Sequence, residues 1–449
     1  METLSLDLAA LRAACAGSVC GPDETGYDRA RRPWNVAVDQ WPAAVCVPAD
    51  ARDIATVLEA ASRARLQVAV QGTGHAAATL GHLSEAVLLK THALTGVAID
   101  PATRSCRAGA GALWQDVVPA AAEHGLAPIA GSSPDVGVVC YTLGGGIGYL
   151  SRRHGLAANH VTAFELVTAT GEQRRVTDGE LFWALRGGGH GLGVVTAIEF
   201  ELVPLPEVVA GGLWWPWERA AEILPAWRAL CAGAPDELTT IFRLLQVPPF
   251  PESPAHLRGR SLANVQVCLA GAEADADALL APLRALAPEL DTVVPAGPDA
   301  LLRLHGDPEG PTPALADHAL LGELPDPAVD ALLEIAGPGS NSPLTSVELR
   351  HLGGALAREP ENAGALPAIE AEFALHTVGI AMGVEAETLI AGRNSALHTA
   401  LTPWIPGRTY TNFAGGRLDA TTAFAEPRRL AAVRKAADPG GLFRTPFLA

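Results

Sequence analysis

The chain lacks any uninterrupted apolar run of about 18 residues, the length needed to span a membrane as a helix. This holds although apolar residues make up 49% of its 449 positions. Its beginning, METLSLDLAALRAACAG, also lacks the basic segment followed by an apolar segment that marks a secretory signal peptide. We therefore expect a cytoplasmic protein with no membrane partner.

Positive charge is scarce. The sequence contains 32 Lys and Arg residues against 49 Asp and Glu residues, which gives a net charge of −17. The densest basic run is RARR at 29–32, which we interpret as a solvated surface. Binding to nucleic acid requires a basic field, so we expect no nucleic-acid partner.

Paired cysteine motifs are absent as well. The seven cysteines are odd in number, dispersed and without CxxC spacing. This pattern is typical of buried thiols in a reducing compartment and argues against a disulfide framework or a zinc site. We expect no bound metal.

The chain is long enough for two or three hydrophobic cores. Helical spacing predicts a helix over 49–66 with Asp50 as its N-cap, a second over 113–126 closed by Gly125, and a last one that stops at Pro439. Short strands are predicted at 67–70, 86–91 and 96–100. Proline-rich turns become frequent after residue 206, which favours a domain boundary there.

Glycine clusters stand out in GTGH, LGGGIG and RGGGHGLG. Glycine allows positive φ and lets backbone amides approach one ligand, although ordinary turns explain most glycine pairs. GTGHAA formally fits a dinucleotide fingerprint, with Asp100 at a tolerable distance. The segment 79–96 lacks the helical period that such a fingerprint requires, so we reject a Rossmann fold.

Several motifs in fixed order carry a family resemblance: VAVQGTGH, GSSPDVGVVCYTLGGGIGYLSRRHGLAANHV, LFWALRGGGHGLGVVTAIEFEL, YTNF and LAAVRKAADPGGLFR. Together they resemble the berberine-bridge-enzyme group of FAD-linked oxidases, within the vanillyl-alcohol-oxidase-like (PCMH-type) flavoproteins. The resemblance implies an α+β fold with an FAD-binding domain of two α+β subdomains at 1–205, its core starting near 38. A substrate domain at 206–407, with an antiparallel sheet covered by helices, and a returning segment at 408–449 would follow.

The same resemblance implies FAD joined covalently through His75, at the position of the family's linking histidine. Without the other motifs, His75 would read as a partly buried, hydrogen-bonded imidazole. Ser133 stands where many members carry a second linking cysteine, so a single covalent bond is expected and Cys140 is interpreted as packing. The remaining cofactor-binding candidates are Gln71, Gly72, Thr73, Gly74, Ala76, Ser132, Val136, Gly137, Thr142, Gly145, Gly146, Gly148, Val195 and Asn412.

Two departures from the family pattern concern polar residues. Asn159 stands where an acid is common in the family. His190 lies in GGGHGLG, where the family more usually has Gly-Gly-Asn-Phe-Gly. His190 is either an atypical polar contact or a surface residue. Val136 is small and aliphatic, which in this family accompanies oxidase behaviour, so O2 is the expected electron acceptor.

The second half of the chain offers candidate catalytic residues. In TSVELRHLGG, strand alternation places Glu348 and Arg350 on one face, and Arg243 is the single charge of another apolar strand. A charge in a half-buried strand is costly unless it has a partner. Glu348 is therefore the first candidate for general base, with Arg350 or Arg243 as counter-ion or substrate anchor. A structural ion pair is the alternative.

His376 is a lower-ranked base, and a core histidine is the other interpretation of it. Tyr141 and Tyr410 are expected near the flavin, and the resemblance places Asn412 at its pyrimidine edge. The expected activity is oxidation of a hydroxyl-bearing small molecule, sugar-like or of secondary metabolism. An oxidative cyclase or oxygenating enzyme and a low-turnover ligand-sequestering flavoprotein stay as alternatives.

Overall fold

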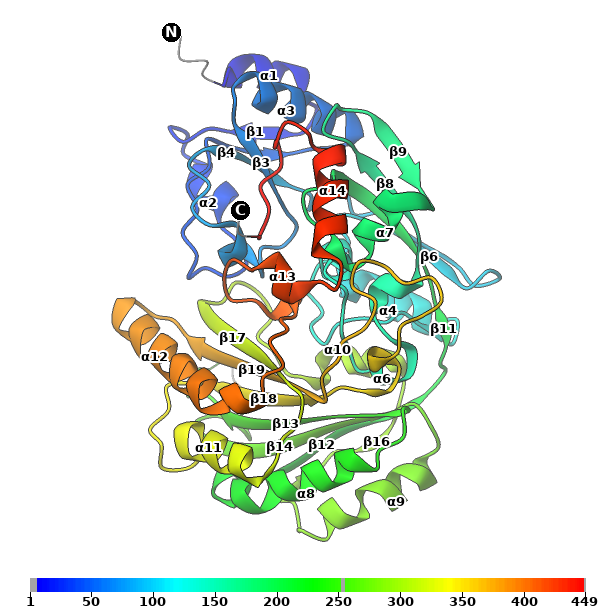
Figure 1. Cartoon of the computed structure of the whole chain (residues 1–449), viewed down its shortest axis with the longest axis vertical. Helices are drawn as coiled ribbons and strands as arrows, with labels where there is room; N and C mark the ends of the chain where they lie inside the picture. The colour runs from blue at the N-terminus through cyan, green and yellow to red at the C-terminus, as the bar shows by residue number, and fades with distance from the viewer. Residues whose placement is uncertain (1–5, 252–254, 448–449) are drawn as a thin grey trace.

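The computed structural model describes residues 6–251 and 255–447. Within these residues the chain forms two halves that lie one above the other (Figure 1). The upper half holds the N-terminal two fifths of the chain together with the C-terminal segment, and the lower half is built on one large sheet. No helix in the described ranges has the length and apolar character needed to cross a membrane.

The first sheet of the upper half has the spatial order β1 (Ser18–Cys20), β2 (Ala44–Val47), β4 (Ala86–Lys90), β3 (Gln67–Gln71). Strands β2 and β3 run parallel to β4, and helix α3 (Ala51–Arg63) connects β2 to β3. As predicted, the carboxylate of Asp50 caps α3 by accepting from the amides of Arg52 and Asp53. Between β3 and β4 lies only the 3-10 turn η1 (Ala77–Leu80), so the crossover helix of a Rossmann unit is missing from this described segment.

The second sheet is antiparallel, with the order β5 (Val97–Asp100), β6 (Ser105–Gly109), β10 (Val194–Glu201), β8 (Val161–Val167), β9 (Gln173–Val176). A short pair, β7 (Leu126–Ala127) and β11 (Val203–Pro204), lies beside it. The predicted helix over 113–126 is α4 (Trp114–Ala122); it ends earlier than predicted because Gly125 closes the following turn at φ 67°. The two sheets confirm the expected FAD-domain architecture of two α+β subdomains.

The lower half confirms the expected antiparallel sheet covered by helices. Its order is β15 (Leu290–Asp291), β12 (Val208–Pro216), β14 (Ser261–Leu269), β13 (Leu238–Gln246), β18 (Ser346–His351), β19 (Phe373–Ile380), β17 (Ala314–Leu321), with β16 (Val294–Ala296) paired to β12. Four helices pack on one face of it (Figure 1): α8 (Ala220–Ala232), α9 (Glu273–Arg284), α11 (Asp326–Ala336) and α12 (Val384–Leu401).

Strand alternation separates the two faces of this sheet. Val347 and Leu349 of β18 join the apolar core under the helices, whereas Glu348 and Arg350 are absent from that core and point to the opposite face. That opposite face meets the upper half, because the Tyr149 hydroxyl donates to Gln266 of β14 over 2.7 Å. A face that carries buried charges at the junction of the two halves is where a polar site can form.

The C-terminal segment returns to the upper half, as Figure 1 shows in orange and red. Phe443 forms a bridge with Val68 of β3, next to α14 (Pro427–Ala437). The remaining elements are short: α1 (Leu8–Ala14), α2 (Tyr27–Arg31), α5 (Val138–Leu143), α6 (Ser151–His154), η2 (Ala157–His160), α7 (Gly179–Gly188), η3 (Trp217–Arg219), η4 (Pro298–Ala300), α10 (Leu301–Leu304), η5 (Gly354–Ala357), η6 (Thr402–Trp404), η7 (Thr411–Phe413) and α13 (Ala420–Ala423).

Candidate active site

His75 lies in the turn that follows β3, with its ring held on two sides. The Thr73 hydroxyl is 2.7 Å from its Nδ1, and the Trp34 ring stacks on it at a centroid distance of 4.0 Å and an angle of 18°. Its Nε2 is buried without a hydrogen-bond partner, 3.5 Å from a carboxylate oxygen of Asp135. Thr73 and Trp34 therefore fix the orientation of the imidazole, and its Nε2 forms no hydrogen bond within the described structure.

Asp135 connects this turn to the lower half. Its carboxylate accepts from Trp34 Nε1 over 2.6 Å and from the Gly310 amide over 2.9 Å. Burial raises the pKa of Asp135, but the nearby His75 ring and the hydrogen bonds from Gly310 and Trp34 outweigh burial and leave it below its usual value. Neither Trp34 nor Asp135 was predicted from the sequence as a site residue; their only signal is proximity to the GTGH and GSSPDVG motifs.

Backbone amides near His75 differ from those of the LGGGIG turn. Within the described residues, the amides of 73–76, Ser132 and Ser133 have no protein acceptor. In LGGGIG, Gly145 donates to the carbonyl oxygen of Thr142 over 3.0 Å and Gly146 donates to the hydroxyl of Tyr410 over 2.9 Å. Clustered free amides suit an anion such as a pyrophosphate. The His75 turn and the segment at Ser132 and Ser133 therefore suit an anion better than the LGGGIG turn does.

The LGGGIG glycines are required by protein neighbours. A Cβ on Gly146 would lie 2.4 Å from the Tyr141 ring, and one on Gly144 would lie 1.8 Å from Asn412 Oδ1. Gly146 also has φ 81°, which L-residues with side chains rarely adopt. We predicted glycine here to make room for a cofactor; the structure shows that its first effect is to let Tyr141 and the 410–413 segment pack closely.

A cleft in the upper half is lined by residues of β3, α5, the RGGGHGLG turn and the C-terminal segment. About 510 Å³ of space in and around it is not filled by atoms, part of it open to solvent, and its lining includes the predicted residue Val195. Cys140 also lines it, and its Sγ would be 3.1 Å from a Cβ on Gly72, so a larger residue there would require Cys140 to shift. The other lining residues are Val70, Thr91, Ala110, Val139, Leu143, Gly189, His190, Gly191, Gly193, Phe443 and Arg444.

Tyr410 and Asn412 join the two halves at the glycine turn. Asn412 Nδ2 donates to the Tyr141 carbonyl over 2.8 Å and to the Tyr410 hydroxyl over 3.2 Å, and the Tyr410 amide donates to His318 Nε2 over 3.1 Å. Burial raises the pKa of both tyrosines. The Tyr141 hydroxyl is buried without a partner in the described structure. The predicted flavin contacts of these three residues stay predictions.

One row of polar residues crosses the large sheet on the face that meets the upper half. Strand pairing places Arg243 opposite Glu348, Glu348 opposite His376, and His376 opposite His318. Burial lowers the pKa of both histidines, that of His318 to about 4. The sequence predicted three members of this row but not their alignment, which depends on strand register.

Glu348 is at the centre of this row and is only 1% exposed. Its Oε1 accepts from Arg350 Nε and Nη2 over 3.0 and 2.9 Å, its Oε2 lies 2.5 Å from His305 Nε2, and Arg243 Nε is 3.9 Å away. Burial alone would raise the pKa of Glu348, but Arg350, His305 and Arg243 hold it well below its usual range. Both predicted arginine partners are therefore in place, together with an unpredicted histidine.

His305 extends the cluster to the FAD-binding half. Its Nδ1 lies 2.6 Å from Asp307, and the other oxygen of Asp307 accepts from the hydroxyl of Ser133. The structure thus connects Ser133, at the position of the family's second linking cysteine, to Glu348. Sequence patterns did not indicate His305 and Asp307, because both lie in the irregular segment that follows α10.

The other predicted residues surround these clusters. Gln71 donates to Gln40 over 3.1 Å, and the Thr142 hydroxyl donates to the Val138 carbonyl inside α5. Ala76 lies in the His75 turn, and Val136 and Gly137 follow Asp135 directly. His190, left open between two interpretations, is half-buried with a pKa lowered by burial to about 4.

Comparison with known proteins supports an FAD site. Residues 42–177 match the FAD binding domain family. The (R)-6-hydroxynicotine oxidase of Paenarthrobacter nicotinovorans is 34% identical over 203 residues, 44% of either chain, and the glucooligosaccharide oxidase of Sarocladium strictum is 30% identical over 192 residues, 42% of this chain and 38% of that relative. The chain thus aligns with less than half the length of these relatives.

Solved structures match over nearly the whole chain. The Physcomitrella patens BBE-like 1 structure has a TM-score of 0.83 at 18% identity and 98% coverage of both chains. The 6-hydroxy-D-nicotine oxidase of Arthrobacter nicotinovorans has a TM-score of 0.79 at 25% identity and 96% coverage of both. The chain therefore contains an FAD binding domain and has the fold of the berberine-bridge-enzyme-like proteins.

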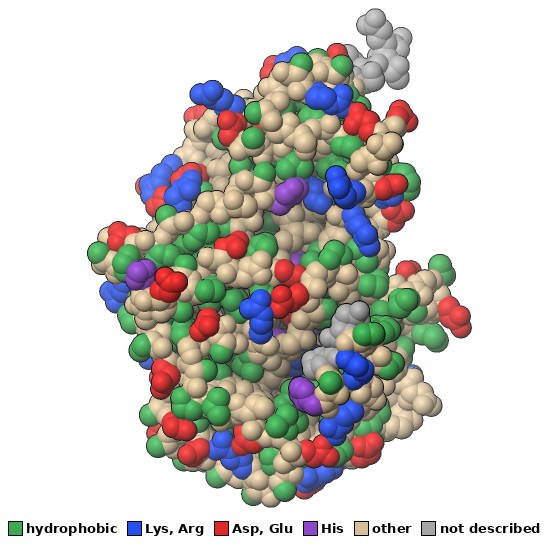
Figure 2. Space-filling view, turned by 180° about the vertical axis from the view of Figure 1, so that it is seen from behind, with side chains coloured by type: hydrophobic (Ala, Val, Ile, Leu, Met, Phe, Trp, Pro, Cys, Tyr) green, Lys and Arg blue, Asp and Glu red, His purple; other side chains and the backbone are tan. Residues whose placement is uncertain are grey.

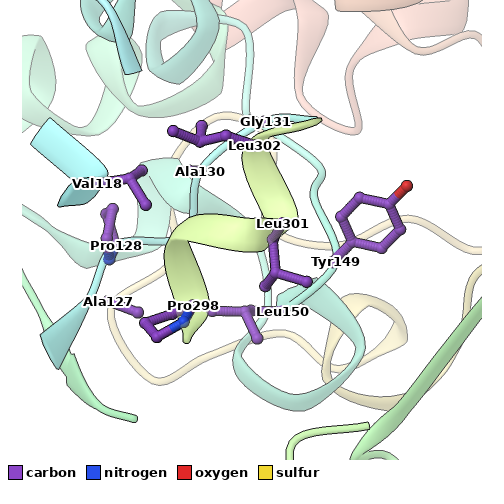
Figure 3. Close-up of a pocket in the computed structure, with 10 residues that line it drawn as sticks. All are labelled: Val118, Ala127, Pro128, Ala130, Gly131, Tyr149, Leu150, Pro298, Leu301 and Leu302. Atoms are coloured by element: carbon purple, nitrogen blue, oxygen red, sulfur yellow. The ribbon is translucent and has the colours of Figure 1, made fainter. Parts of the chain in front are cut away.

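The described residues fit FAD. Free amides at 73–76 and at Ser132 and Ser133 suit its phosphates, and the buried His75 Nε2 and Tyr141 hydroxyl have no hydrogen-bond partner among the described residues. By contrast, the apolar hollow of Figure 3 is lined by none of the predicted site residues, and Tyr149 at its edge already donates to Gln266. On the face drawn in Figure 2, acidic and basic side chains are interspersed.

Proposed function

We propose that this protein is an FAD-dependent oxidase that removes hydride from a carbon bearing a hydroxyl group, on a sugar-like or secondary-metabolite substrate, with O2 as the electron acceptor. The observation that carries the proposal is the buried carboxylate of Glu348 on the sheet face that meets the FAD-binding half. The glucooligosaccharide and xylooligosaccharide oxidases among its relatives support a hydroxyl-bearing substrate.

Bound FAD would supply the hydride acceptor. Glu348 would accept the hydroxyl proton of the substrate while hydride leaves the adjacent carbon. A carboxylate has about four acceptor positions, and three of those on Glu348 face Arg350 and His305. The remaining position on Oε2, beside Arg243 Nε at 3.9 Å, would accept from a substrate hydroxyl, and Arg350 would fix the carboxylate plane.

We further propose that FAD is held by one covalent bond, through His75. Its Nε2 is buried without a partner while Thr73 engages Nδ1, which supports a reactive, oriented imidazole. Ser133 cannot form the thioether of a second link, and its hydroxyl is hydrogen-bonded to Asp307.

The proposed domain limits stay 1–205, 206–407 and 408–449. The seven free cysteines support a reducing, cytoplasmic location.

The spectrum and intact mass of the acid-precipitated protein test the cofactor. A yellow pellet that carries the mass of one flavin supports the covalent link; a colourless protein that takes up no FAD refutes the whole assignment. Activity is then tested by anaerobic reduction of the flavin with glucooligosaccharides and xylooligosaccharides, followed by O2 consumption. In Glu348→Gln, reduction should be lost while ligand binding persists.

Amine oxidation is a second candidate, favoured by the likeness to (R)-6-hydroxynicotine oxidase. An amine donor would not need a base for a hydroxyl proton. Reduction of the flavin by (R)-6-hydroxynicotine, insensitive to Glu348→Gln, would favour it over the hydroxyl-directed proposal. Binding of these compounds with no flavin reduction at all would instead favour the sequestering alternative.

A further inference from the structure

The ring of His305 lies between two carboxylates. Its Nε2 is 2.5 Å from Glu348 Oε2, and its Nδ1 is 2.6 Å from Asp307 Oδ1. A neutral imidazole has one N–H and one lone pair, so it can donate to only one of these oxygens. With both carboxylates ionised, the two contacts are satisfied together only when the ring carries both protons.

The charges that face the ring come from several elements. They are Asp307 on the same loop, Glu348 and Arg350 from β18, Arg243 from β13 and His376 from β19. Burial and Arg243 lower the pKa of His305, whereas Asp307 and Glu348 raise it, and the net result lies above its usual value. Arg243 Nη1 also donates to the carbonyl oxygen of His305, which fixes the loop.

We propose that His305 is a positioning residue that carries a proton on each ring nitrogen, one toward Asp307 and one toward Glu348, and that this doubly protonated ring sets the basicity of Glu348 and thereby the pH dependence of flavin reduction. This inference rests on the proposed function. An imidazolium in contact with Glu348 keeps the carboxylate ionised and oriented but makes it a weak base. As pH rises through the pKa of His305, one proton passes from the ring to water, and Glu348 becomes a stronger acceptor for the substrate hydroxyl proton.

Nitrogen-15 NMR of the histidine rings in the flavin-loaded protein tests the proton assignment without turnover. His305→Gln identifies the signal by its loss. We expect a doubly protonated ring at pH 7 in the wild type. Asp307→Asn keeps an acceptor for Nδ1–H but removes its charge, so the pKa of His305 should fall by about one pH unit or more.

Asp317→Asn is the matched control, because Asp317 lies 3.2 Å from a different histidine, His398. It should lower the pKa of His398 and leave that of His305 unchanged. A neutral His305 ring in the wild type at pH 7 would overturn the inference even if Asp307→Asn failed to fold. An unchanged pKa of His305 in a folded Asp307→Asn variant would overturn it as well.

The predicted effect of His305 on the reaction is tested by anaerobic stopped-flow reduction of the flavin by a glucooligosaccharide across pH. The midpoint of the rate should coincide with the pKa of His305 and move to lower pH in Asp307→Asn by the same amount. A rate midpoint that stays in place while the ring pKa moves would refute the positioning role. Failure of every donor to reduce the flavin would refute the proposed function instead, and the titration would still decide the protonation of His305.

Discussion

Arg152 fastens the segment after the glycine turn to the large sheet, and its removal should destabilise the protein strongly. The side chain is 3% exposed and lies in α6. It donates to the carbonyl oxygens of Leu238, Leu352, Ala234 and Pro235, and its Nη1 lies 3.0 Å from His351 Nε2. No acidic side chain forms an ion pair with Arg152 in the described structure, so backbone carbonyls compensate its charge.

The magnitude of Arg152→Met follows from the groups that it leaves behind. The carbonyls of Leu238 and Leu352 are at buried contacts, and each would lose its donor at about 1–3 kcal/mol. The two contacts to Ala234 and Pro235 are partly buried and count for less. Relief of the buried charge offsets part of the loss, and methionine refills much of the volume. We expect a net decrease of about 3 kcal/mol in the free energy of unfolding, within the range for breaking a buried charged cluster.

Urea denaturation followed by tryptophan fluorescence measures this decrease. The neighbouring Arg153→Met is the matched control, because Arg153 is exposed and donates to one partly buried carbonyl, that of Ala270. It should change the free energy of unfolding by less than about 1 kcal/mol. Equal effects of the two substitutions would refute the assignment of Arg152 as the buried anchor.

The Arg152→Met substitution should also change how the free energy of unfolding depends on pH. Burial, and then the charge of Arg152, lower the pKa of His351 to about 3. In the unfolded chain the pKa is about 6.5, so wild-type stability falls as pH drops from there, because the unfolded state binds the proton more tightly. Without Arg152 the depression is smaller and the loss is smaller. Between pH 7 and pH 5 the two proteins should lose stability in parallel, because His351 stays unprotonated in both folded states. The gap between wild type and Arg152→Met should narrow only as pH falls further toward 3, where the folded wild type still excludes the proton; a gap that widens there would contradict the reasoning.

Three further predictions concern the FAD site and the thiols. His75→Ala should release the flavin on acid precipitation, and retention of the flavin mass would show that another residue forms the link. Tyr410→Phe deprives the Gly146 amide of its acceptor and should destabilise the protein by about 1–3 kcal/mol, measured by denaturation against Phe413→Leu as a control. Burial raises the thiol pKa of four cysteines to about 12: Cys46, Cys106, Cys231 and Cys268. These thiols should resist thiol reagents until the protein unfolds. Rapid labelling of them in the native protein would be inconsistent with the fold.

Local patterns predicted the elements but not the contacts between them. Alternation in TSVELRHLGG correctly placed Glu348 and Arg350 on one face, because the period of a strand is a property of neighbouring residues. The capping of α3 by Asp50 was predictable for the same reason. Motif order supplied the FAD-binding architecture, which the fold comparison confirms.

The partners of Glu348 could not be predicted in full, because they depend on register and on an irregular loop. Arg243 and Glu348 are 105 positions apart in the sequence. They face each other only because the register of β13 and β18 pairs them. His305 and Asp307 lie in a segment without period, where neither alternation nor helical spacing applies. The same holds for Asp135, whose bond to the Gly310 amide is set by tertiary packing.

This loop explains why a charged site can be assembled at the junction of the two halves. Residues 305–310 approach the FAD-binding half through two separate bonds, Asp307 with Ser133 and Gly310 with Asp135, while His305 approaches the sheet through Glu348. The charge on Glu348 is thereby offset by groups from β18, β13 and the loop at once, which is the condition for keeping an ionised carboxylate buried. A substitution that loosens the loop should therefore alter the His75 turn and the Glu348 cluster together, although no hydrogen bond or ion pair among the described residues joins the two directly.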